Sequence, residues 1–155
     1  MQRLVLVAGV LLCFSALADN AIQPVKKWTL LDQNDKAYTL DDDAQVLLVA
    51  RSMSAAKLVN AAVEDAPEGF LEKRHMIYVA DIEKMPSLIK VVAVPAMRSA
   101  KYRILLDRDG RVASDYNGDR DSVQWLTLKN GAVVKETRFT DGTKLKQAVE
   151  SQAIQ

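Results

Sequence analysis

VLLVARSMSAAK, residues 46–57, combines the pattern of a buried strand with the pattern of a helix start. Val46–Val49 form an unbroken apolar run, which is typical of a strand covered on both faces. Ser52 and Ser54 follow, and either hydroxyl can accept a hydrogen bond from the free N–H groups at the start of a helix. Apolar residues then recur at helical spacing on one face, namely Ala55, Val59, Ala62, Val63 and Ala66. We therefore expect a buried strand that runs directly into a helix.

The first 18 residues have the pattern of a secretory signal peptide. Arg3 supplies a positive charge, Leu4–Leu12 is almost wholly apolar, and Ala16-Leu17-Ala18 matches a small-x-small cleavage site. The apolar run is too short for a stable membrane anchor. We therefore predict cleavage after Ala18, export to the periplasm, one mature domain over residues 19–155, and no stable membrane anchor after cleavage.

Composition narrows the classes of function. The 155 residues suit one domain, and 21 basic against 20 acidic side chains leave no basic field that would attract nucleic acid. Cys13 is the only cysteine, and it lies within the predicted signal peptide. The predicted mature protein therefore has neither a disulfide nor a thiolate, although it enters a compartment where disulfides form.

The rest of the chain predicts strands that alternate with helices, followed by hairpins and a closing helix. The predicted strands are residues 28–31, 37–40, 76–82, 102–106, 111–113, 123–128 and 132–134. Asp109-Gly110 and Asn130-Gly131 predict hairpin turns, because these residue pairs tolerate positive φ. The order predicts a single α/β domain with a mixed sheet flanked by helices and an N-terminal hairpin.

Two further helices are predicted after residue 85. One begins at Pro86 and ends or kinks at Pro95, with an inner face of Leu88, Ile89, Val92 and Ala93. The last begins near Thr143, with Leu145, Ala148 and Val149 on one face.

Three stretches together indicate a family. They are WTLLDQNDKAYTLDD at residues 28–42, VLLVARSMSAAK at residues 46–57, and YRILLDRDGRVASDYNGDRDSVQWLTLKNGAVV at residues 102–134. Their order and content resemble the thioredoxin superfamily, most closely its exported TlpA/peroxiredoxin-like branch, and the second stretch also resembles the YtfJ-like exported proteins. The resemblance implies a thioredoxin-like three-layer sandwich in which residues 46–57 hold the strand and helix of the active site.

The same resemblance places the defining residues of thiol chemistry. The CxxC motif of the family falls on Met53-Ser54-Ala55-Ala56, and its cis-proline falls on Ser122. A cis bond before a non-proline residue costs roughly 2.5–4 kcal/mol, so we expect a trans peptide at Ser122. The resemblance thus supports the fold but not thiol chemistry.

No other catalytic group replaces the missing cysteines. A nucleophilic Ser52 or Ser54 needs a general base within reach, and the only histidine, His75, is expected at the opposite end of a thioredoxin-like sheet. No second histidine or cysteine accompanies His75 as a metal ligand, and Asp107–Gly110 lacks the remaining ligands of a calcium loop. The sequence therefore predicts no catalytic residue, no metal site and no cofactor.

Two functional hypotheses remain open. In the first, the protein is a periplasmic binding or accessory protein without thiol redox chemistry, whose partner is another periplasmic protein or a peptide. The resemblance places its binding surface at Arg51, Ser52, Met53, Ser54, Asp121, Ser122 and Val123. In the second, it is an oxidoreductase-related enzyme that uses a non-thiol cofactor. The alternative within the first hypothesis is that this surface binds nothing and only closes the domain.

Overall fold

The computed structural model describes residues 26–154. The predicted signal peptide, the cleavage after Ala18 and Cys13 lie outside the described residues. Within residues 26–154, no helix is long and apolar enough to cross a membrane.

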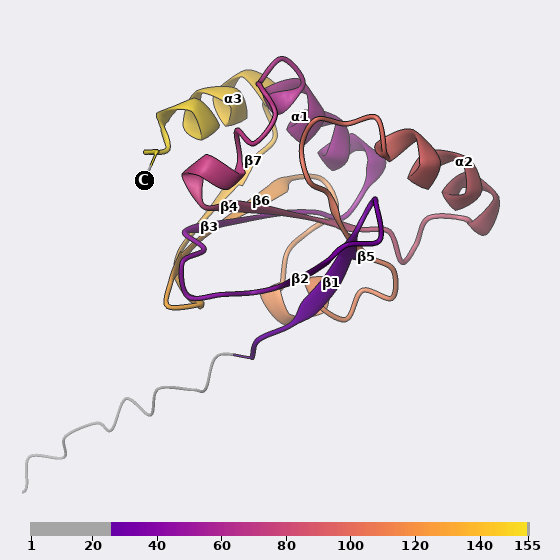
Figure 1. Ribbon diagram of the computed structural model, residues 1–155, viewed down its shortest axis with the longest axis horizontal. Helices are drawn as coiled ribbons and strands as arrows, with labels where there is room; N and C mark the ends of the chain where they lie inside the picture. Colours follow the sequence, from indigo (N-terminus) through magenta and orange to yellow (C-terminus); the bar gives the residue numbers. More distant parts are fainter. Residues whose placement is uncertain (1–25, 155) are drawn as a thin grey trace, which may run out of the picture.

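A seven-stranded mixed sheet forms the centre of the fold (Figure 1). The strands are β1 (Thr29–Asp32), β2 (Ala37–Thr39), β3 (Val46–Ala50), β4 (Met76–Asp81), β5 (Leu105–Asp107), β6 (Val123–Lys129) and β7 (Ala132–Phe139). They lie side by side in the order β2-β1-β5-β4-β3-β6-β7. The strand predicted from Val46 is thus a central strand, parallel to β4 and antiparallel to β6, and all of its residues are buried.

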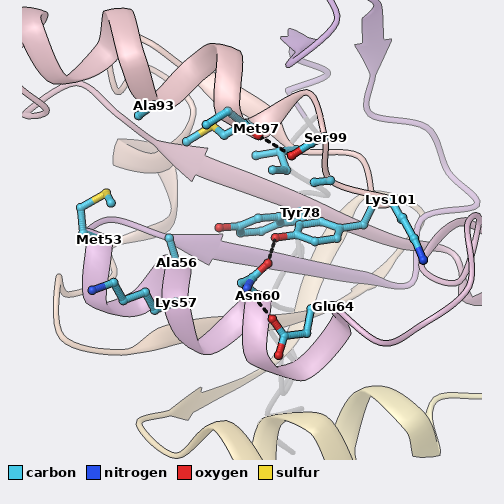
Figure 2. A pocket seen from close by; sticks show the side chains of 14 residues that line it. Met53, Ala56, Lys57, Asn60, Glu64, Tyr78, Ala93, Met97, Ser99 and Lys101 are labelled. Atoms are coloured by element: carbon cyan, nitrogen blue, oxygen red, sulfur yellow. Dashed lines mark hydrogen bonds between the residues drawn. The ribbon is translucent and has the colours of Figure 1, made fainter.

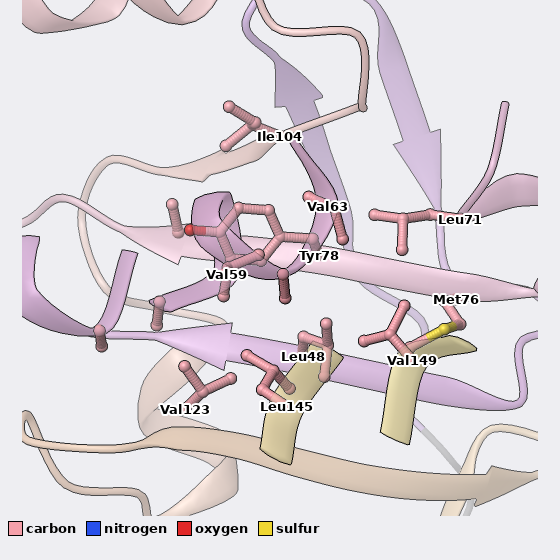
Figure 3. Close-up of a cluster of buried hydrophobic side chains, with 14 of the residues drawn as sticks. Leu48, Val59, Val63, Leu71, Met76, Tyr78, Ile104, Val123, Leu145 and Val149 are labelled. Atoms are coloured by element: carbon pink, nitrogen blue, oxygen red, sulfur yellow. The ribbon is translucent and has the colours of Figure 1, made fainter. Parts of the chain in front are cut away.

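Three α-helices accompany the sheet: α1 (Met53–Val63), α2 (Ser87–Met97) and α3 (Gly142–Ser151). Helices α1 and α3 pack together over one face of β3 and β4, where Leu48, Val59 and Leu145 belong to one buried cluster (Figure 3). The opposite face is covered by the 3-10 helix η2 (Ala113–Tyr116) and by the segment before β1, through Trp28 and Val112. These layers confirm the predicted thioredoxin-like α/β architecture.

Two of the predicted hairpins form. β1 and β2 pair antiparallel around a turn in which the Asp32 carboxylate accepts hydrogen bonds from the N–H groups of Asn34 and Lys36, at 2.8 and 3.0 Å. β6 and β7 are joined at Asn130 and Gly131, whose φ angles are 51° and 77°. Positive φ at both turn residues matches the right-handed twist of the strands, so the Asn-Gly signal acts as predicted.

The hairpin predicted around Asp109-Gly110 does not form. β5 pairs instead with β1 and β4, and the chain after Gly110 continues into η2. The cause is the buried Asp107 carboxylate, which accepts hydrogen bonds from the N–H groups of Val112 and Ala113 at 3.0 and 2.7 Å. These bonds turn residues 111–113 away from a strand ladder.

The inner face predicted for α2 is also wrong. Leu88 is 86% exposed, Ile89 47% and Val92 72%, whereas Val94 is the one buried residue of the helix. All residues of α2 except Ser87 and Lys90 are apolar, so hydrophobic periodicity carries no information about which face points inward. Pro86 precedes the helix, and Pro95 lies in its last turn, two residues before its end.

Candidate functional site

The junction between β3 and α1 lies at the carboxyl end of the central strand. Ser52 is the N-cap of α1, and its hydroxyl oxygen accepts a hydrogen bond from the N–H of Ala55 at 3.1 Å. This bond satisfies one of the free donors at the helix start, as the sequence predicted. The Ser52 hydroxyl also donates to the carbonyl of Arg120 and lies 3.0 Å from the Ser54 hydroxyl.

The loop before β6 forms the second half of the site. Because β3 and β6 are antiparallel, with Val49 opposite Gln124, the residues before β6 lie beside those after β3. The Asp119 carboxylate fixes this loop by accepting hydrogen bonds from the N–H of Asp121 and from both the N–H and the hydroxyl of Ser122, at 2.8–2.9 Å. Within residues 26–154 no peptide bond is cis, so the predicted trans peptide at Ser122 is confirmed.

The structure brings the seven predicted site residues together but makes only some of them accessible. Met53 is 51% exposed, Ser54 and Asp121 are exposed, and Ser52 is half-buried. Arg51, Ser122 and Val123 are buried, with exposed fractions of 7%, 4% and 0%. The accessible part of the surface is therefore smaller than the sequence predicted.

Arg51 is the largest departure, because the resemblance placed it on the binding surface and the structure buries it. Its Nη2 donates to the carbonyl of Ala113 at 2.8 Å, so the guanidinium ties the β3–α1 junction to η2. Gly118 makes room for it, since a Cβ at that position would lie 1.8 Å from Nη1 of Arg51. Burial lowers the pKa of Arg51, while the Asp81 carboxylate opposes that shift. Arg51 thus supports the site from within.

An ion-pair cluster that the sequence did not reveal borders the loop. The Arg138 guanidinium binds the carboxylates of Asp119 and Glu136 and donates to the carbonyl of Asn117 at 3.1 Å. Hydrogen bonds from the Ser122 hydroxyl and from Arg138 lower the pKa of Asp119 to about 2. The spacing Asp119-x-x-Ser122 was a local signal for this turn, but Arg138 comes from β7, and no sequence pattern connects it to the loop.

The site lacks the groups that hydrolytic or thiol chemistry needs. His75 precedes β4, and because β3 and β4 are parallel it lies at the opposite end of the strands from Ser52, roughly 20 Å away along the strand direction. Met53 and Ala56 occupy the first turn of α1 and carry no thiol. No metal-binding group of three or more His, Cys, Asp or Glu side chains occurs in residues 26–154. The accessible surface can make contacts, but it offers no nucleophile with a base.

Two cavities adjoin the start of α1. The smaller, about 140 Å³, lies between the β3–α1 junction and α2, and Ser52, Met53 and Arg120 line it. The larger, about 530 Å³, lies between α1 and α2 over β4 (Figure 2). Met53, Ala56 and Met97 line both cavities.

Solved structures establish the fold. The exposed lipoprotein thioredoxin Etrx1 of Streptococcus pneumoniae matches with a TM-score of 0.53 at 17% identity, over 81% of this chain and 98% of that one. StoA of Bacillus subtilis matches with a TM-score of 0.52 at 11% identity, over 79% and 96% of the two chains. The fold is thioredoxin-like. Peroxidoxin BcpB of Mycobacterium tuberculosis shares it at a TM-score of 0.51 and 14% identity, over 81% and 92%.

Sequence comparison adds nothing to this result. No protein-family model matches the chain, and no curated protein matches it either. The thioredoxin-like fold therefore rests on the arrangement of the elements.

Proposed function

We propose that this is an exported, periplasmic thioredoxin-fold protein that binds another protein or a peptide and performs no thiol chemistry. The observation that carries the proposal is the pair Met53 and Ala56 at the start of α1, where the family resemblance places the CxxC cysteines. A methionine that is 51% exposed offers a flexible, polarizable apolar contact but no thiolate.

The proposed contact surface consists of the accessible residues at the β3–α1 junction and the loop before β6, namely Ser52, Met53, Ser54, Arg120 and Asp121. The Ser52–Arg120 hydrogen bond joins the two segments, and the Asp119 carboxylate holds the second one. A surface fixed in this way loses little conformational entropy when a partner binds, which favours affinity. Arg51 and Ser122 act as buried supports rather than as contacts.

Export is the second part of the proposal. It rests on the signal-peptide pattern of residues 1–18. N-terminal sequencing of the protein from its native host should give Asp19 as the first residue, and a mature form that retains Met1 would refute export by cleavage.

Site-specific crosslinking tests the binding surface. A photo-reactive phenylalanine analogue replaces Met53 in one variant and Val134, which is 60% exposed on β7, in a matched control. Irradiation of the native host should give a discrete adduct from position 53 alone, and Asp121→Lys should weaken that adduct. Equal adducts from both positions, or none from position 53, would overturn the proposal. Native mass spectrometry of the same protein detects a bound prosthetic group, which would favour the enzyme hypothesis instead.

A further inference from the structure

The cavity between α1 and α2 carries an inference beyond the proposed contact surface. Its volume of about 530 Å³ falls in the range of roughly 300–1,000 Å³ found for small-molecule sites. Its wall is mainly apolar, formed by side chains such as Met97, Tyr102 and Ile104. The cavity exists because α2 contributes only Val94 to the core, so the helix spans the space above β4 without filling it.

One polar side chain of the wall has no hydrogen-bond partner among the described residues. Tyr78 is 3% exposed and forms part of the cavity wall, and no hydrogen bond to its hydroxyl is found within residues 26–154. Burial raises the pKa of Tyr78, so the hydroxyl stays a protonated donor at any physiological pH. The hydroxyl points toward the end of the cavity near Ala56 and Met53 (Figure 2). The hydroxyl is therefore free to donate a hydrogen bond to an acceptor on a ligand in the cavity.

The other uncharged polar side chains of the wall already form hydrogen bonds within the protein. The Tyr102 hydroxyl donates to the Asn60 amide oxygen at 2.8 Å, the Asn60 amide donates to Glu64 at 3.0 Å, and the Ser99 hydroxyl donates to the Ala96 carbonyl at 2.8 Å. A peptide backbone in the cavity would leave several of its own N–H and C=O groups unpaired. The mainly apolar wall therefore suits a hydrocarbon chain better than a peptide backbone.

Cationic side chains gather at the Met53 end of the cavity. Lys57 lines the larger cavity, and Lys84 and Arg120 line the smaller one that shares Met53 with it. None of the ion pairs formed within the described part of the chain includes these three side chains. Asp81 is the acidic residue in the smaller wall. Lys101 and Glu64 line the larger cavity away from Met53, so Lys57, Lys84 and Arg120 give the Met53 end its positive charge.

We propose that this cavity binds a single-chain amphiphile with an anionic headgroup, such as a long-chain carboxylate. The hydrocarbon chain lies between α1 and α2 against Tyr102, Met97 and Ile104. The carboxylate lies at the Met53 end, where it accepts a hydrogen bond from Tyr78 and is attracted by Lys57 and Lys84. The two cavities and the contact surface share Ser52, Met53 and Arg120, but Tyr78, Met97 and Lys57 belong to the cavities alone, so variants at these three positions test the ligand separately.

Fluorescence titration with dansylaminoundecanoic acid tests the site in the mature protein. Saturable enhancement is expected, and dodecanoate should displace the probe better than dodecanol, which has a similar chain length but no charge. Ala96→Trp, which places a large side chain at the cavity wall, should abolish saturable binding, whereas Val91→Trp on the outer side of the same helix should not. Equal loss in both variants, or no saturable binding by the wild type, would overturn the proposal.

Two further pairs of variants locate the headgroup. Tyr78→Phe should weaken probe binding about threefold to tenfold without lowering stability, because the hydroxyl has no protein partner to lose. Lys57→Glu should weaken it by a similar factor, while Lys129→Glu in the remote β6–β7 turn should have no effect. Unchanged affinity in both Tyr78→Phe and Lys57→Glu would exclude a carboxylate at this end. Binding to phosphatidylglycerol vesicles without binding of the free carboxylate would overturn the single-chain ligand in favour of a membrane surface.

Discussion

At the scale of single residues, Asp119 couples the loop before β6 to protonation. Its pKa is lowered to about 2 in the folded protein, mainly by hydrogen bonds from the Ser122 hydroxyl and Arg138, whereas an unfolded chain has a value near 3.9. A lowered folded pKa stabilises the protein above the unfolded value, and this contribution is lost as the pH falls from about 4 to about 2.

We expect Asp119→Asn to flatten the dependence of stability on pH in that interval. Urea unfolding, followed by fluorescence at several pH values between about 4.5 and about 2, measures the free energy of unfolding at each pH. Asp65→Asn, at an exposed position at the end of α1, is the control and should leave the wild-type slope intact. An Asp119→Asn variant with the wild-type slope would show that the loop does not depend on this carboxylate.

A substitution at Gly118 tests whether the buried Arg51 side chain supports the fold. A Cβ added at Gly118 would lie 1.8 Å from Arg51 Nη1 and 2.4 Å from its Cζ, and Arg51 can move only by breaking its hydrogen bond to Ala113. Gly118→Ala should therefore lower the free energy of unfolding by about 1–3 kcal/mol. Gly142→Ala is the matched control, because its Cβ would meet Ala61 at an ordinary 3.7 Å in the first turn of α3. Equal stabilities of the two variants would contradict the buried role of Arg51.

Local residue signals and long-range contacts differ in how well the sequence reveals them. The capping role of Ser52 was predictable, because it depends only on the neighbouring helix start. The burial of Arg51 was not, because its partner Ala113 and the space beside Gly118 come from residues more than sixty positions later. The same reason hid Arg138 from sequence analysis.

At the scale of elements, α2 is the least anchored helix. Val94 is its one buried residue, whereas α1 buries Ala55, Val59, Ala62 and Val63. Elements with few buried contacts need little free energy to unfold locally. Amide hydrogen exchange should therefore be faster in α2 than in α1 by about tenfold or more, and comparable protection in the two helices would refute the loose packing of α2. Repeating the exchange with saturating dodecanoate should slow α2 selectively if the cavity holds the proposed ligand.

The sequence predicted the type of each element better than it predicted strand pairing or the face that a helix buries. The continuous apolar run at Val46 predicted a central strand, and Asn130-Gly131 predicted a hairpin, because each signal is self-contained. The Asp107–Gly110 turn carries an equally good hairpin signal, yet the buried Asp107 carboxylate binds the following N–H groups and diverts the chain. Helix α2 was placed correctly, but its uniformly apolar sequence could not fix its inward face.

At the scale of the whole molecule, the fold places Met53 at a helix start that borders the loop before β6 and two cavities. We predict no thiol-dependent electron transfer, because residues 19–155 contain no cysteine. Purified mature protein should not accelerate insulin reduction by dithiothreitol above the uncatalysed rate, with an active thioredoxin as the positive control. A rate increase that persists after all tags and copurifying proteins are removed would contradict this account.

The most direct test of the central claim is the double variant Met53→Cys/Ala56→Cys. Side chains three residues apart on a helix have Cβ atoms about 5–6 Å apart, and small adjustments bring them within bonding range. The cysteine at position 53 should have a lowered pKa, because its thiolate would lie at the positive end of α1. Mass spectrometry after mild oxidation should show one intramolecular disulfide in a folded protein, and the reduced form should alkylate faster at position 53 than at position 56. A folded double variant that remains fully reduced would mean that Met53 and Ala56 do not occupy the positions of the thioredoxin cysteines.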